Sequence, residues 1–158
     1  MTTRFDINDF LAHRRLALVG LSRNPKDFSC ALFRELRNRG YDMVPVNPLA
    51  TEVQGCRSFA RLQDINPPVE GALVMTPPHQ TLGVVHDCAQ AGIRRVWMYR
   101  GVGQGAVSTD AVDFCIAKNI RLVEGYCPFM FFPGTSIFHR FHGFLLKLAG
   151  NYPASRAV

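Results

Sequence analysis

Short runs of β-forming residues alternate with longer stretches of helical periodicity, and this alternation constrains the fold more than any other feature of the chain. It is typical of βαβ units, in which helices connect parallel strands and cover both faces of a sheet. We therefore expect an α/β, Rossmann-like three-layer fold with a five-stranded parallel sheet. The strands are predicted at 16–20, 42–48, 71–76, 94–99 and 120–125. The helices between them are predicted at 29–39, capped by Ser29, at 80–91 and at 108–118, with one helical turn at 59–65 within the irregular segment 49–69.

Both ends of the chain add a predicted helix to this sheet. Residues 7–13 suggest a short helix capped by Asp6, and residues 136–149 place Ile, Phe and Leu side chains at helical spacing. This extra apolar C-terminal helix is expected to pack on the core or to form a homodimer contact. The length of the chain favours one domain. We predict a single domain over residues 1–158, with its core at 14–130 and a C-terminal helical extension at 131–158.

The charge and the cysteines restrict the partners and the compartment. A formal net charge of +6 favours anionic ligands. The basic residues are scattered rather than grouped, so a small phosphorylated ligand is predicted in preference to nucleic acid. Five cysteines form no CxxC pair and the N-terminus lacks the apolar run of a secretion signal, which predicts a reduced, cytoplasmic protein. No stretch supplies the ~20 apolar residues of a membrane-spanning helix.

The loop after the first predicted strand carries the strongest candidates for a binding site. In parallel sheets ligands bind beyond the carboxyl ends of the strands, where loop amides and helix N-termini converge. Gly20 and Leu21 lead into Ser22, which offers a hydroxyl, and into Arg23 and Lys26, which can pair with phosphate oxygens. The pattern lacks the further glycines of GxGxxG. It predicts a nucleotide site without specifying a dinucleotide.

Asn47 stands at the end of the second predicted strand, where NAD-binding chains carry an acidic residue that holds the ribose hydroxyls. A neutral amide there weakens the NAD interpretation. It is compatible with an ADP ribose that bears a 3′-phosphate, as in coenzyme A. Asn47 and Pro48 are also common turn residues, so the two positions remain open to a purely structural interpretation.

Several segments together resemble the small stand-alone CoA-binding proteins, whose domain is related to the CoA-binding part of succinyl-CoA ligase alpha subunits. The matching segments are ALVGLSRNP at 17–25, GYDMVPVNP at 40–48, Thr76-Pro77-Pro78, VWMYRGV at 96–102 and Cys127-Pro128. The resemblance covers about residues 14–130. It implies a non-catalytic CoA or acyl-CoA binder, because the larger relatives place their catalytic histidine in a second domain. Tyr99-Arg100 departs from the glutamine-type residue expected before Gly101.

Carried over by position, the resemblance implies roles for particular residues. The phosphates would lie on the loop after the first strand, and the nucleotide would lie between the ends of the second and third strands. The pantetheine arm would lie beside the end of the fourth strand. The implied ligand-binding residues are Gly20, Leu21, Ser22, Arg23 and Lys26 for the phosphates, Asn47, Pro48, Thr76 and Pro77 for the nucleotide, and Met98 and Gly101 for the pantetheine arm.

Other candidates have ordinary structural explanations beside the functional ones. Gly20 could be a turn glycine, and Arg23 and Lys26 could be solvated charges. Cys127 could form a mixed disulfide with the CoA thiol, although a buried thiol is the more common role. His79 and His86 are interpreted as surface residues, and His139 and His142 have no nearby group that would complete a metal site.

The chain shows neither a nucleophile with its base nor a pair of carboxylates in different environments. We therefore predict a carrier, sensor or regulatory protein. The alternatives from other classes are an NAD(P)-dependent or nucleotide-dependent enzyme subunit and an oligomerising regulatory module.

Overall fold

The computed structural model describes residues 1–101 and 103–134. Its main sheet has five strands in the order β2-β1-β5-β6-β7, and every neighbouring pair is parallel. The predicted α/β, Rossmann-like fold with a five-stranded parallel sheet is confirmed. The strands are β1 Arg15–Val19, β2 Asp42–Val46, β5 Gly71–Val74, β6 Arg95–Tyr99 and β7 Arg121–Tyr126.

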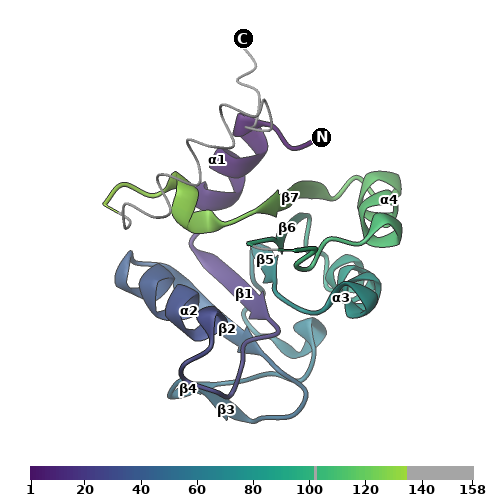
Figure 1. The fold of residues 1–158 in the computed structure, drawn as a ribbon. Coiled ribbons are helices and arrows are strands. Elements are labelled where there is room, and N and C mark those ends of the chain that lie inside the picture. Colours follow the sequence, from purple (N-terminus) through teal and green to yellow (C-terminus); the bar gives the residue numbers. More distant parts are fainter. Residues whose placement is uncertain (102, 135–158) are drawn as a thin grey trace.

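Helices cover both faces of the sheet and complete three layers (Figure 1). On one face α1 (Arg4–Ala12) and α2 (Phe28–Asn38) pack on Leu16, Leu18 and their neighbours. On the other face α3 (Pro78–Gln90) and α4 (Thr109–Ala117) pack on Ala17, Val19 and the residues around them. Successive β1 residues after Arg15 are thus buried on opposite faces, which explains why residues 16–19 are all apolar.

Trp97 is completely buried on the α1/α2 face. Its ring meets that of Phe10 edge to face at 5.3 Å between centroids. Its indole N–H donates to the Tyr126 carbonyl at 2.9 Å, so its polar atom also has a partner.

Two helices have N-caps other than those that their sequence pattern predicts. Asp6 is not the cap of α1, because Thr3 is: Asp6 N–H donates to Thr3 Oγ1 at 3.2 Å, and Thr3 N–H donates to Asp6 Oδ2 at 2.8 Å. This reciprocal pair is a capping box. Asp27 rather than Ser29 caps α2, since the Ser29 N–H donates to Asp27 Oδ1 at 2.8 Å. In both cases a polar residue inside the first turn resembles a cap in the sequence.

The irregular segment 49–69 contains a hairpin that the sequence pattern did not reveal. Strands β3 (Glu52–Val53) and β4 (Cys56–Arg57) pair antiparallel around Gln54 and Gly55, whose φ angles are 54° and 69°. Two positive φ angles in a two-residue loop match the tight turn that hairpins favour. The predicted helical turn within 59–65 is present as the 3₁₀ turn η1, Leu62–Asp64, and a second one, η2, covers Pro128–Phe131.

The predicted C-terminal helix at 136–149, its proposed dimer contact, His139 and His142 all lie outside the described residues. Within residues 1–101 and 103–134, no helix is long and apolar enough to cross a membrane.

Candidate functional site

The strand order creates a break between β1 and β5 at the carboxyl edge of the sheet. From β1 the chain moves outward to β2 and then returns past β1 to β5, so the loops that follow β1 and β5 diverge. Open α/β sheets bind their ligands at such a switch point. Gly20 lies there with φ of +90°, and a Cβ atom at this position would be 3.0 Å from the Met75 carbonyl carbon and from the Thr76 nitrogen. Glycine is therefore required by the close approach of the two strand ends.

A cavity of about 780 Å³ opens at this break, and we call it the nucleotide cavity. It reaches from the β1 and β2 strand ends to α3. The sequence-predicted residues Gly20, Leu21, Ser22, Arg23, Asn47, Pro48 and Thr76 all line it. The structure thus brings together, from three strand ends, seven of the positions named from the sequence.

A second cavity of about 380 Å³ adjoins the first, and we call it the arm cavity. Gly20, Ser22 and Thr76 line both cavities, so the two are neighbours along the same edge of the sheet. Pro77, predicted from the sequence, lines the arm cavity only. The rings of Phe28 and Tyr99 also line it.

Those two rings stack at 5.4 Å between centroids, which makes part of the arm-cavity wall aromatic. Burial raises the pKa of Tyr99 to about 12, so its hydroxyl is protonated at neutral pH and serves as a hydrogen-bond group without charge.

Three of the binding residues predicted from the sequence line neither of these two cavities. Met98 has no exposed surface and packs in the core with α3 and α4. Gly101 lies against Tyr99, whose hydroxyl a Cβ atom at position 101 would strike. Lys26 is exposed, and its backbone N–H donates to Asn24 Oδ1 at 3.1 Å. Of the two basic side chains in the loop after β1, Arg23 lines the nucleotide cavity and Lys26 does not.

The loop between β1 and α2 is held in shape by its own hydrogen bonds. Ser22 N–H donates to Ser29 Oγ at 3.0 Å, and Ser29 Oγ–H donates to Asp27 Oδ1 at 2.6 Å. Ser22 Oγ in turn accepts from Asn24 N–H at 3.1 Å. The Asp27 carboxylate therefore occupies the N-terminus of α2. A ligand phosphate would meet Arg23 and the loop beyond β1 instead of a free helix end.

Asn47 connects two of the loops that form the nucleotide cavity. Its Nδ2 donates to the Leu21 carbonyl at 3.0 Å, and its Oδ1 accepts from the Leu49 N–H at 2.8 Å. An aspartate could accept from Leu49 but could not donate to Leu21. The amide of Asn47 therefore also has a structural role, because only an amide can make both hydrogen bonds.

We predict that Asn47→Asp lowers the free energy of unfolding by about 1–3 kcal/mol at neutral pH, since a carboxylate oxygen would then face the Leu21 carbonyl without a proton between them. Urea denaturation of both proteins measures this loss. Pro48→Ala, at an exposed neighbour in the same lining, is the matched control and should change stability much less. An Asn47→Asp protein as stable as the parent would show that the bond to Leu21 contributes nothing.

One wall of the nucleotide cavity, which α3 provides, was not predicted from the sequence. Gln80, Gly83, Val84 and Asp87 line the cavity at the spacing i, i+3, i+4 and i+7. This spacing places them on one face of the helix, and it is visible in the sequence as a possible sign of a cavity wall. The apolar residues on the buried face of the same helix form a stronger pattern, so the sequence analysis identified that face instead. The Asp87 carboxylate accepts from Gln63 Nε2 at 2.9 Å, so it is already partnered.

Cys127 is 4% exposed, and burial raises the pKa of its thiol to about 11. A protonated thiol is a poor nucleophile at neutral pH. The structural interpretation of Cys127 as a small buried side chain therefore agrees with its surroundings. His86 is exposed and stacks on Phe114 at 4.0 Å, as a surface residue of α3.

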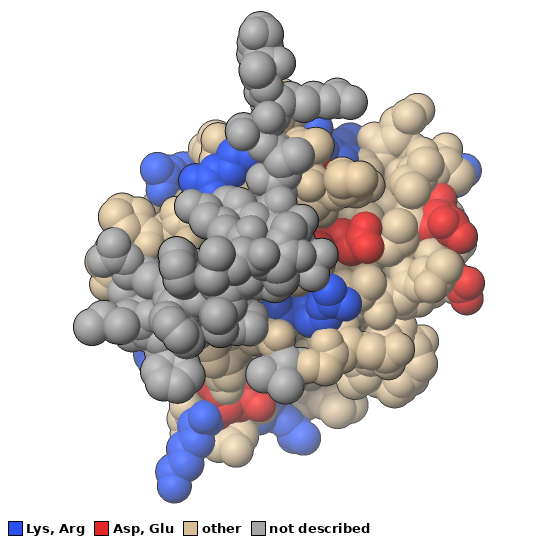
Figure 2. All heavy atoms as spheres, turned by 45° about the horizontal axis from the view of Figure 1, so that its top comes forward, with Lys and Arg blue, Asp and Glu red and all other residues tan. Residues whose placement is uncertain are grey.

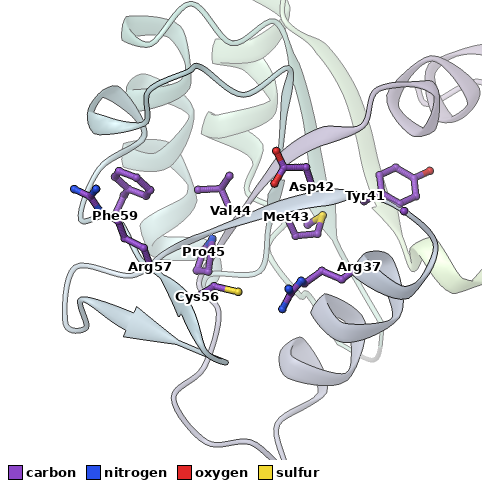
Figure 3. Close-up of a pocket in the computed structure, with 10 residues that line it drawn as sticks. Arg37, Tyr41, Asp42, Met43, Val44, Pro45, Cys56, Arg57 and Phe59 are labelled. Carbon is purple, nitrogen blue, oxygen red and sulfur yellow. The ribbon is translucent and has the colours of Figure 1, made fainter.

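A further hollow of about 620 Å³, the edge hollow, runs along the outer strand β2 (Figure 3). Its lining combines β2 side chains with Arg37 from α2 and with Cys56 and Arg57 from β4. Pro45 lies within this strand and lacks an N–H, and Phe59 already pairs with Val46 on the same edge, so this edge is a poor template for a further strand. The hollow follows the side of one strand and does not reach the switch point.

Charge is distributed rather than grouped on the face that Figure 2 shows. Where described residues form that face, Lys and Arg side chains lie near Asp and Glu side chains and make no continuous basic stripe. This agrees with the scatter of basic residues along the sequence.

Fold and cleft together define a class of protein: a Rossmann-like α/β domain with a cleft at the carboxyl edge of its sheet. A family model described as a CoA binding domain matches residues 14–133. The chain belongs to this family of CoA binding domains, and the resemblance noted from its sequence is confirmed.

Individual relatives include stand-alone proteins and a ligase subunit. The uncharacterized protein YneT of Bacillus subtilis is 26% identical over 114 residues, which cover 72% of this chain and 82% of YneT. The alpha subunit of ADP-forming acetate–CoA ligase II of Pyrococcus furiosus is 27% identical over 88 residues, which cover 55% of this chain and 19% of that subunit. A solved structure of a hypothetical protein from Pyrococcus horikoshii has a TM-score of 0.74 at 26% identity, covering 80% of this chain and 87% of that one.

Proposed function

We propose that this protein binds coenzyme A or an acyl-CoA through its ADP-phosphate moiety, as a carrier, sensor or regulatory protein without turnover of its own. The observation that carries the proposal is the continuity of the two cavities, which share Gly20, Ser22 and Thr76. A compact mononucleotide needs one of them. A nucleotide with a long flexible arm would extend through both.

The adenine would lie in the nucleotide cavity beside Leu49. This side chain is 74% exposed, although it is large and apolar, and it lines the cavity at the end of β2. An adenine face covering it would remove apolar surface from water, which favours binding. Gln80 on α3 offers an amide to the edge of the same base.

The pantetheine arm would continue into the arm cavity and pass Phe28 and Tyr99. Its amides need hydrogen-bond partners and its methyl groups need apolar contact, and this cavity offers Ser22 and the neutral Tyr99 hydroxyl beside two aromatic rings. The thiol or thioester would then lie toward Gly105 and Ala106, which complete the lining. Membership of the CoA binding domain family supports this ligand.

Isothermal titration calorimetry with CoA, acetyl-CoA and NADH tests the proposal. We expect CoA or acetyl-CoA to bind with a 1:1 stoichiometry and NADH to bind much more weakly. A preference for NADH would favour the NAD(P)-dependent alternative, and the absence of binding to either CoA compound would overturn the proposed function.

A further inference from the structure

The edge hollow along β2 shares no lining residue with the nucleotide cavity or the arm cavity. Its volume of about 620 Å³ is within the range of small-molecule sites, which is about 300–1,000 Å³. Phe59 bounds it at one end, because the Phe59 N–H donates to the Pro45 carbonyl at 3.0 Å. The edge hollow is therefore a second candidate site, separate from the first.

The two walls of the hollow, α2 and the β3–β4 hairpin, are joined by a hydrogen bond beside it. Arg34 Nη1 donates to Gln54 Oε1 at 2.8 Å, and this bond connects α2 to the turn of the hairpin. The hairpin is closed in turn by Ser58 N–H, which donates to the Thr51 carbonyl at 2.8 Å. These contacts help to fix the spacing of the walls, as in a largely pre-formed site.

Two arginine side chains bring positive charge to the hollow from opposite walls. Arg37 comes from α2 and Arg57 from β4, and both are exposed. Figure 3 shows them at different ends of the hollow, Arg57 beside Phe59 and Arg37 further along β2, with Cys56 and Pro45 between them. Within the described part of the chain, neither guanidinium has an ion pair or a hydrogen bond.

The part of β2 that lines the hollow between these arginines is apolar. It consists of Met43, Val44 and Pro45. Asp42 is the acidic residue of the lining, and its carboxylate already pairs with Arg15. The hollow thus presents two unpaired cations that are separated by apolar surface.

We propose that the edge hollow binds a small organic dianion, in which an apolar chain joins two carboxylate groups. Each carboxylate would accept N–H donors from one guanidinium, whose planar fork matches the two carboxylate oxygens. The chain would cover the apolar part of β2 and remove it from water. The site does not depend on the proposed function, since the CoA cavities have no residue in common with it.

Calorimetric titration of the full chain with the linear dicarboxylates from glutarate to suberate tests the proposal. Each is compared, at equal ionic strength, with the monocarboxylate of the same chain length. We expect the best-fitting dicarboxylate to bind about 10-fold more tightly than its monocarboxylate, as for one additional hydrogen-bonded charge pair. The absence of this preference throughout the series would overturn the site.

Variants of the two arginines show whether each holds one end of the ligand. Arg37→Gln and Arg57→Gln should each weaken dicarboxylate binding about 10-fold. They should affect the monocarboxylate much less, because it can use the remaining arginine. Lys118→Gln is the matched control, since it removes the same charge at the end of α4, which precedes the strand farthest from β2. Equal losses in all three variants would mean that only overall charge matters, and the site would be wrong.

Cys56 provides a second measurement inside the hollow. It lies in the lining and is partly exposed, whereas the other four cysteines are buried. A bound dicarboxylate should slow alkylation of Cys56 by the neutral reagent iodoacetamide about 10-fold at about ten times its Kd. Peptide mass spectrometry measures the rate at this cysteine. An unchanged rate would place the ligand elsewhere and overturn the proposal, while the proposed CoA function would stand.

Discussion

Gly20→Ala is expected to lower the free energy of unfolding by about 2–4 kcal/mol, the combined cost of a left-handed backbone and a steric conflict. The φ of Gly20 is +90°, and the added Cβ would lie 3.0 Å from two backbone atoms at the end of β5. Backbone cannot move aside as the end of a flexible side chain can. The ends of β1 and β5 would have to separate. This would change the shape of both the nucleotide cavity and the arm cavity, because the residues at these strand ends line both. We therefore also expect CoA binding to be lost.

Two other glycines separate the causes. Gly40 has φ of +86° and nothing within 4 Å of the Cβ atom that an alanine would add, so Gly40→Ala isolates the backbone cost of about 1 kcal/mol. Gly83 lines the nucleotide cavity inside α3 with open space around it, and Gly83→Ala should raise stability by about 0.5–1 kcal/mol. Urea denaturation of the three variants gives the comparison. Equal losses for Gly20→Ala and Gly40→Ala would show that the contact with β5 is unimportant.

The sequence predicted the fold well because the sheet is buried on both faces. Such strands must be apolar throughout, and helices of regular periodicity must separate them, so both signals are strong and local. The hairpin β3–β4 was missed because strands of two residues bury little and carry no periodicity. The caps Thr3 and Asp27 were missed because a second polar residue follows each of them within a few positions.

The site residues that directly follow strands could be predicted from the sequence. Those whose side-chain direction is set by packing were harder to predict. Gly20, Asn47 and Thr76 follow strands, and parallel topology brings strand ends to one edge of the sheet. Met98 was assigned to the cleft by position in the family pattern, but its side chain points into the core with α3 and α4. Which face a strand residue takes depends on register, and register is set by the whole sheet.

Arg23→Glu is expected to weaken CoA binding by about 100-fold at an ionic strength of about 0.15 M, because it removes a charge-assisted contact and adds a carboxylate that repels the phosphates. Arg23 lines the nucleotide cavity from the loop after β1, where the phosphates of the ligand are predicted to lie. Calorimetric titration with CoA measures the change. The side chain is exposed, so the variant should fold like the parent.

Lys26→Glu is the matched control, since it changes the net charge by the same amount three residues along the same exposed loop. Lys26 does not belong to the lining of the nucleotide or the arm cavity, so its effect would act only through the electrostatic field of its charge. At about 0.15 M salt the screening length is about 8 Å, which should limit the loss of affinity to a few-fold. A loss for Lys26→Glu as large as that for Arg23→Glu would mean that binding responds to overall charge, and the assignment of Arg23 as the phosphate contact would then be wrong.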